Sequence, residues 1–124
     1  MRQVTAAVTA AVTAAVRLQE APLSVVVVAT ITPSDGHYDE VRQILLDAVP
    51  QVQEEDGCER YSLHEDGERF VMIERWASAQ ALDTHSNGEV LRDAGRALAG
   101  KLAGKLDVRS LSGVPAGDPA KGAL

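Results

Sequence analysis

The chain has 124 residues and a mass of 13.1 kDa, which is the length of one domain. Eighteen acidic and twelve basic residues give a net charge of −6, so we expect no nucleic-acid partner, because a basic surface for neutralising phosphates is missing. The single cysteine, Cys58, excludes an internal disulfide framework and a metal cage built from cysteines.

Residues 1–22 form a low-complexity leader in which Val-Thr-Ala-Ala recurs. The period of four would place its valines along one stripe of a helix, so the leader is either an accessory helix or a mobile extension. It is too weakly apolar to span a membrane or to act as a signal peptide. We therefore expect a cytoplasmic protein that does not contact membranes. Residues 113–124 are rich in Gly, Pro and Ala and predict a flexible tail.

Between these ends, residues 23–112 show the pattern of one α+β domain. Residues 24–31 are a β-branched run that is apolar on both faces, which predicts a strand buried on both sides. Apolar residues then recur at helical spacing over residues 38–52, and Gly57 is expected to end that helix.

Two strand-like runs, residues 58–65 and 68–76, flank Asp66-Gly67, a dipeptide typical of a two-residue type I′ hairpin turn. Such a turn would set Glu59 directly opposite Glu74. This like-charge pair would raise the pKa of one carboxyl unless a cation lies between them. The register also places one set of residues on a shared face of the hairpin: Tyr61, Leu63, Phe70, Met72, Glu74 and Trp76.

Ser78 is expected to cap a short helix that runs to His85. The sequence Ser86-Asn87-Gly88-Glu89 has the form of a capping box and predicts the start of a further helix. A last strand over residues 106–111 completes the order β-α-β-β-α-β. This order is typical of a ferredoxin-like sandwich with its helices on one side of the sheet.

The predicted sheet would have more apolar surface than its helices can cover. Residues 25–31 are apolar on both faces, and Val71 and Ile73 lie on the face opposite to Phe70 and Met72. Monomers seldom expose an apolar face of this extent. We therefore expect a homodimer that associates through its sheet faces. The alternative is that the leader folds over the open face.

Glu55-Asp56-Gly57-Cys58 before the second strand, and Glu74-Arg75-Trp76 running on to His85, resemble the antibiotic biosynthesis monooxygenase family and its quinol monooxygenase-like members. The resemblance covers residues 24–111. It implies a dimeric α+β barrel. It also implies, for some members, oxidation of phenols or quinols by dioxygen without metal or flavin.

Under this resemblance the protein needs a base, a dry apolar pocket and a hydrogen-bond donor for the developing oxyanion. His85 or Glu74 would handle the proton. A small aromatic substrate would be bound by Trp76, Tyr61, Phe70, Met72 and Asn87. The alternative roles are core packing for the apolar residues, an ion pair for Glu74 and a hydrogen-bonded helix end for His85.

Neither a metal nor an organic cofactor is expected, and dioxygen would be the co-substrate. His37, His64 and His85 are far apart in the sequence and form no close ligand pair. Haem is not expected, because residues 86–111 contain no His where haem-degrading relatives carry their iron ligand. The sequence thus predicts a cofactor-independent monooxygenase. The alternatives are an isomerase-like member of the same superfamily and a non-catalytic dimeric protein that binds a small ligand.

Overall fold

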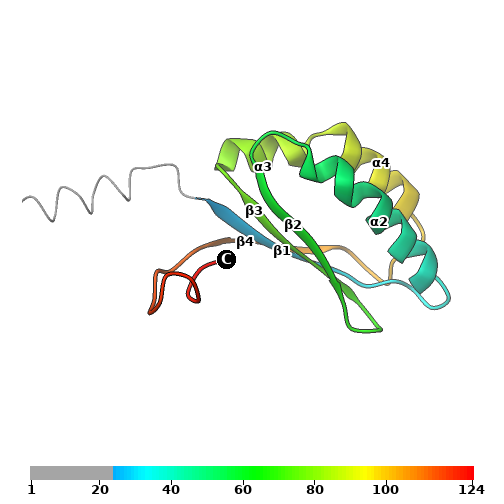
Figure 1. Cartoon of the computed structure of the whole chain (residues 1–124). Helices are drawn as coiled ribbons and strands as arrows, with labels where there is room; N and C mark the ends of the chain where they lie inside the picture. Colours follow the sequence, from blue (N-terminus) through cyan, green and yellow to red (C-terminus); the bar gives the residue numbers. More distant parts are fainter. Residues whose placement is uncertain (1–23) are drawn as a thin grey trace, which may run out of the picture.

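The computed structural model describes residues 24–124; the leader expected for residues 1–22 lies outside the described residues. In chain order the elements are β1 (Val25–Ile31), α2 (Tyr38–Gln53), β2 (Cys58–Glu65), β3 (Phe70–Trp76), α3 (Ala79–Ser86), α4 (Glu89–Leu98) and β4 (Asp107–Ser112). The strands form one antiparallel sheet in the order β2-β3-β1-β4, and the helices lie on one side of it (Figure 1). This is the ferredoxin-like α+β fold that the sequence predicts.

The sheet is buried on its helix side and half-buried on the other. Along β1, Val27, Ala29 and Ile31 are at most 8% exposed, while the residues between them are only half-buried. The same alternation runs along β3. A strand that is apolar on both faces is therefore fully buried on only one face within residues 24–124.

The loop of the β2–β3 hairpin is longer than the predicted two-residue turn. It comprises residues 66–69, and the side chain of Asp66 holds its shape. Asp66 Oδ1 accepts hydrogen bonds from the backbone N–H groups of Glu68 and Arg69, at 2.9 and 2.8 Å. φ is positive at Gly67 but not at Asp66, so the type I′ prediction was wrong.

The longer loop shifts the strand register by two residues. Tyr61, not Glu59, lies opposite Glu74. Glu59 sits in a β-bulge, and its Oε1 is 3.2 Å from Nε of Arg75 in an ion pair. The predicted pair of Glu59 with Glu74 was therefore wrong. A shift of two residues preserves the face of each side chain beyond the bulge, so the predicted shared face is confirmed.

The start of α3 is confirmed, and the predicted capping box of α4 is wrong. Ser78 caps α3, where its Oγ accepts a hydrogen bond from the Ala81 N–H at 3.1 Å. Ser86 still belongs to α3 and donates its hydroxyl proton to the Leu82 carbonyl at 2.9 Å, so it cannot cap the next helix. The N-cap of α4 is Gly88, which has no side chain to offer.

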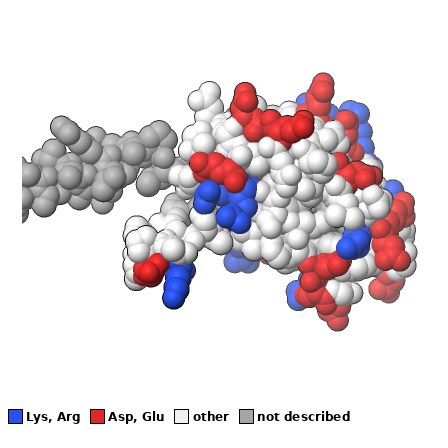
Figure 2. Space-filling model, viewed as in Figure 1, with Lys and Arg blue, Asp and Glu red and all other residues white. Residues whose placement is uncertain are grey.

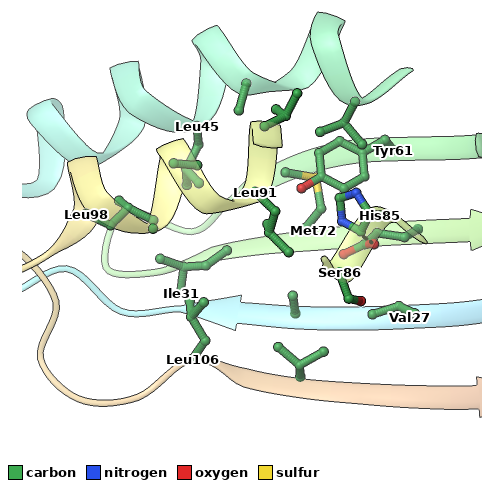
Figure 3. A pocket seen from close by; sticks show the side chains of 18 of the residues that line it. Val27, Ile31, Leu45, Tyr61, Met72, His85, Ser86, Leu91, Leu98 and Leu106 are labelled. Atoms are coloured by element: carbon green, nitrogen blue, oxygen red, sulfur yellow. Dashed lines mark ion pairs between the residues drawn. The ribbon is translucent and has the colours of Figure 1, made fainter. Parts of the chain in front are cut away.

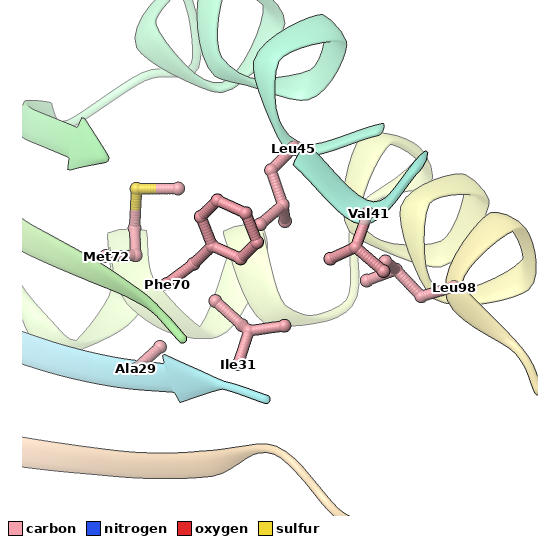
Figure 4. Packing of buried hydrophobic residues seen from close by; sticks show 7 residues of the cluster. All are labelled: Ala29, Ile31, Val41, Leu45, Phe70, Met72 and Leu98. Carbon is pink, nitrogen blue, oxygen red and sulfur yellow. The ribbon is translucent and has the colours of Figure 1, made fainter. Parts of the chain in front are cut away.

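The main core lies between the helices and the sheet (Figure 4). Phe70 is completely buried there and stacks on Tyr38, with the ring centroids 4.6 Å apart. A smaller cluster of Val27, Val52 and Trp76 packs against α3 residues. Each fully buried side chain of this size contributes roughly 1.5–3 kcal/mol. The main cluster consists of Ala29, Ile31, Val41, Leu45, Phe70, Met72 and Leu98.

The edge strand β4 is exposed along its whole length. Large apolar side chains remain exposed in and just before it: Leu106 at 43%, Val108 at 57% and Leu111 at 47%. The chain then turns back, and the Arg75 guanidinium donates a hydrogen bond to the Leu124 carbonyl. The end of the tail thus reaches the sheet face that the helices leave open.

Acidic side chains dominate the charged surface on the face that Figure 2 shows, and its Lys and Arg side chains occur in small separate groups. This distribution agrees with the net charge of −6. Within residues 24–124, no helix has the length and apolar character needed to cross a membrane.

Candidate active site

His85, near the end of α3, lies between aromatic side chains above the sheet. His85 is 4% exposed. The imidazole stacks on the fully buried indole of Trp76, with centroids 4.4 Å apart and an interplanar angle of 27°. The ring of Tyr61 meets the imidazole edge-on, with centroids 5.7 Å apart. These contacts fix the plane of the imidazole and leave its two nitrogens to polar partners.

Glu55 holds one of these nitrogens. It lies in the loop between α2 and β2, and its Oε1 is 2.7 Å from His85 Nδ1. The loop can pack this closely against α3 because of Gly57, which has a φ of +80°. A Cβ at Gly57 would lie 2.5 Å from Cβ of Ala81 in α3. The glycine therefore permits the loop path that brings Glu55 to the imidazole.

Glu74 of β3 lies on the other side of His85. It is 5% exposed, and its Oε1 accepts a hydrogen bond from Trp76 Nε1 at 2.9 Å. The same oxygen is 3.9 Å from His85 Nε2. Burial raises the pKa of Glu74 more than the Trp76 hydrogen bond and the His85 charge lower it. The carboxyl therefore retains a proton more readily than an exposed glutamate does.

A cavity of about 160 Å³ opens beside these groups, between the helices and the sheet (Figure 3). Tyr61, Glu74, His85 and Ser86 supply the polar side chains of its wall, and Tyr61 and Met72 lie close to His85 in Figure 3. The rest of the wall is predominantly apolar. It includes Val27, Ala29 and Ile31 from β1, Leu91, Ala94 and Leu98 from α4, and Leu106 and Val108 at the edge strand.

Burial raises the pKa of the Tyr61 phenol further above its ordinary value, with the Glu74 and Glu55 carboxylates acting in the same direction. The Tyr61 hydroxyl therefore keeps its proton at neutral pH and is available as a hydrogen-bond donor. Among residues 24–124 no group of three or more His, Cys, Asp or Glu side chains is arranged to hold a metal ion.

The structure brings together some of the residues predicted from the sequence and separates others. His85, Glu74, Tyr61 and Met72 line the cavity. Trp76 lies behind His85 and supports it from outside the cavity wall. Two predicted residues lie elsewhere: Phe70 packs in the main core, and Asn87 is an exposed helix end whose side chain donates to the Asp83 carbonyl at 2.9 Å.

Sequence reasoning did not identify Glu55 as a site residue. It noted the motif Glu55-Asp56-Gly57-Cys58 without giving the carboxylate a role. The available signal was Gly57, because a glycine shortly after a carboxylate allows the close backbone approach seen here. The cavity wall formed by α4 and the edge strand was also missed. In the sequence, the apolar residues of this wall have the pattern of ordinary core residues.

The model of the family described as "Antibiotic biosynthesis monooxygenase" matches residues 24–97, which include Glu55, Glu74 and His85. The chain belongs to this family. The resemblance inferred from the sequence motifs is thus confirmed for the antibiotic biosynthesis monooxygenase family.

Relatives of this family member support the same assignment. A Mycobacterium tuberculosis protein named "Putative monooxygenase Rv0793" is 36% identical over 63 residues, which are 49% of this chain and 62% of that protein. The crystal structure of PA3566 from Pseudomonas aeruginosa is 28% identical, with a TM-score of 0.71 over 77% of this chain and 98% of that one. The structure of Rv0793 itself gives 26% identity and a TM-score of 0.69 over 77% and 98%. The sequence match thus spans less than two thirds of the Mycobacterium tuberculosis protein, whereas each structural match spans nearly all of the chain that it matches.

Proposed function

We propose that this antibiotic biosynthesis monooxygenase family member oxidises a single-ring phenol or quinol with dioxygen and needs no metal or organic cofactor. One observation carries the proposal: the imidazole of His85 and the carboxyl of Glu74 both border a predominantly apolar cavity of about 160 Å³. A dry apolar cavity of roughly 150 Å³ is large enough to bind benzene. The size therefore suits one aromatic ring.

The residues of the cavity provide what the reaction requires of a protein. His85 Nε2 removes the phenolic proton, with Glu74 as the neighbouring acid–base group. The Tyr61 hydroxyl donates a hydrogen bond to the phenolate oxygen and stabilises its charge. The apolar walls exclude water while the electron-rich phenolate reacts with dioxygen.

The overall reaction balances without an external reductant. A phenol with a free ring position and one dioxygen give one quinone and one water. One oxygen atom forms the new carbonyl group, and the other leaves as water with the two hydrogens that the substrate loses. The substrate supplies all four electrons.

Oxygen consumption tests this activity directly. Purified protein is incubated with a panel of single-ring phenols and quinols in a metal-chelating buffer, and oxygen uptake is compared with quinone formation. We expect one dioxygen per quinone, and loss of turnover in His85→Gln. Uptake that disappears with the chelator would overturn the metal-free mechanism. A rearranged product formed without oxygen would indicate an isomerase, and binding without turnover would indicate a ligand-binding protein.

We also infer that two copies associate through the open faces of their sheets. Val28 and Ile73 pair on that face, Leu111 of the edge strand pairs with Val26 one step along the same face of β1, and the described chain offers no helix to cover them. Burial of such a face provides a gross driving force of roughly 25 cal/mol per Å². Sedimentation at micromolar concentration should report a dimer that Ile73→Glu disrupts. Leu46→Glu, on the outer side of α2, is the control and should leave the dimer intact. A monomeric wild-type protein would refute the inference.

A further inference from the structure

We propose that Glu55, His85 and Glu74 form a proton relay that connects the cavity to solvent, with Glu55 as its outer end. The relay deepens the proposed function, on which its role in turnover rests. Glu55 lies on the Nδ1 side of the imidazole at 2.7 Å, and Glu74 lies on the Nε2 side at 3.9 Å. One ring thus joins two carboxyl groups that do not meet each other directly.

Exposure along this row rises in one direction. The side chains of Glu74 and His85 are 6% and 4% exposed, and that of Glu55 is 23% exposed. Glu74 and His85 also line the cavity, whereas Glu55 does not. A proton that enters the row from the cavity can therefore reach water at Glu55.

The wider gap on the Nε2 side is suited to a substrate oxygen. A distance of 3.9 Å is too long for a hydrogen bond between Nε2 and the Glu74 carboxyl. It is short enough for a third oxygen, placed on the cavity side, to lie at about 2.8 Å from both atoms. A phenolic hydroxyl in that position can give its proton to His85 while it remains beside Glu74.

The starting tautomer follows from Glu55. When the Glu55 carboxylate is ionised it can only accept a hydrogen bond, so in the neutral imidazole the Nδ1 that it faces at 2.7 Å carries the proton and Nε2 carries the lone pair. Deprotonation of the substrate then forms an Nε2–H bond as the phenolic O–H bond breaks. The Nδ1 proton passes to Glu55, and His85 is neutral again in its other tautomer.

The return step restores the first state. When the second oxygen atom of dioxygen leaves as hydroxide, the Nε2 proton passes to it and forms water. Glu55 returns a proton to Nδ1, either its own or one from solvent. The cycle therefore neither gains nor loses a proton overall, and the imidazole ring does not have to rotate to return to its first tautomer. This point matters because the stacked indole of Trp76, 4.4 Å away, hinders rotation of the ring.

Other titratable groups near the row keep their protons. Burial raises the pKa of the Tyr61 phenol and of the Cys58 thiol, both on β2, and the Glu55 and Glu74 charges add to both effects. Tyr61 and Cys58 therefore do not take part in the proposed proton transfer between His85 and its two carboxyl neighbours.

The experiment uses 4-nitrophenol, a single-ring phenol whose ionisation changes its absorbance. The probe is bound to the full-length protein, the pH is raised in a stopped-flow mixer, and the rate of proton loss is followed. Glu55→Gln keeps an acceptor for Nδ1–H but cannot take its proton, so we expect at least about a tenfold slower rate at unchanged affinity. A small carboxylate added to the buffer should restore the rate, because the Glu55 end is open to water. Glu54→Gln is the matched control, since Glu54 is an exposed neighbour outside the site, and it should behave as wild type.

The outcomes separate the relay from the oxygenase activity. An unchanged rate in Glu55→Gln overturns the relay, even if the protein consumes oxygen. A slower rate that buffer cannot restore, with weaker binding, overturns it in favour of a structural role for Glu55. A slower, buffer-restored rate in a protein that takes up no oxygen supports the relay and rejects the oxygenase. Where turnover is present, Glu55→Gln should lower kcat by the same factor and leave KM unchanged.

Discussion

Gly57→Ala should be far more destabilising than the same substitution at Gly67. Both glycines have left-handed backbone angles, with φ of +80° and +90°. An alanine with such backbone angles costs about 1–2 kcal/mol of stability. A Cβ built at Gly67 would have no atom of a non-neighbouring residue within 4 Å, so no steric clash adds to this cost. At Gly57 the new Cβ would lie 2.5 Å from the Ala81 Cβ, and overpacking of this kind costs a further ~1–3 kcal/mol.

The total for Gly57→Ala is therefore about 2–5 kcal/mol, and that for Gly67→Ala about 1–2 kcal/mol. For a domain of this size each kcal/mol lowers Tm by roughly 4–8 °C. Thermal and urea unfolding of both variants measure the difference. The double variant Gly57→Ala/Ala81→Gly removes the contact and should recover part of the loss, less about 1 kcal/mol for glycine in α3. Equal losses at Gly57 and Gly67 would refute the close-packing argument.

Further predictions concern the cavity and its polar end. Ala94→Leu should fill part of the cavity and weaken 4-nitrophenol binding by about tenfold or more, with little change in Tm. Tyr61→Phe should lower kcat by roughly 10²–10³-fold, the usual loss when one oxyanion donor is removed, and should leave KM nearly constant. Burial raises the pKa of Glu74 above 4.5, so the native state binds its proton more tightly than the unfolded chain does. The free energy of unfolding of the wild type should therefore fall as pH rises from 4.5 through the raised pKa, and Glu74→Gln should lack this fall.

Each of these predictions has a result that contradicts it. Undiminished binding of 4-nitrophenol by Ala94→Leu would place the ligand outside the cavity. Full activity in Tyr61→Phe would show that the Tyr61 hydroxyl does not stabilise the substrate oxyanion. Parallel stability curves for the wild type and Glu74→Gln would show that Glu74 titrates as an exposed glutamate does.

Alternation of apolar and polar residues was sufficient to predict which side chains share a face of the sheet. That pattern has a period of two, so it is unaffected by the two-residue shift in the hairpin. The register itself depended on the loop, where the Asp66 side chain bonds to the backbone N–H groups of Glu68 and Arg69. The turn propensity of an Asp-Gly pair does not take into account that the aspartate side chain can form these hydrogen bonds in place of a type I′ turn.

The candidate site was predictable where its residues lie on regular elements. Glu74 and Trp76 follow from the β3 alternation, and His85 from the helix that Ser78 starts. Glu55 lies on a loop, and its contact with His85 spans 30 residues. A loop direction is set by backbone angles and by packing against a distant helix, and neither is encoded in a local pattern of polarity.

The edge strand gains little burial in the folded chain, yet Val108 and the preceding Leu106 form one wall of the cavity. Segments with few buried contacts open most often, so β4 should exchange its amide hydrogens sooner than β1 or β3 does. A molecule seated against Val108 adds contacts that only the closed strand can make. A ligand bound in the cavity should therefore slow amide hydrogen exchange in β4 far more than in the central strands β1 and β3.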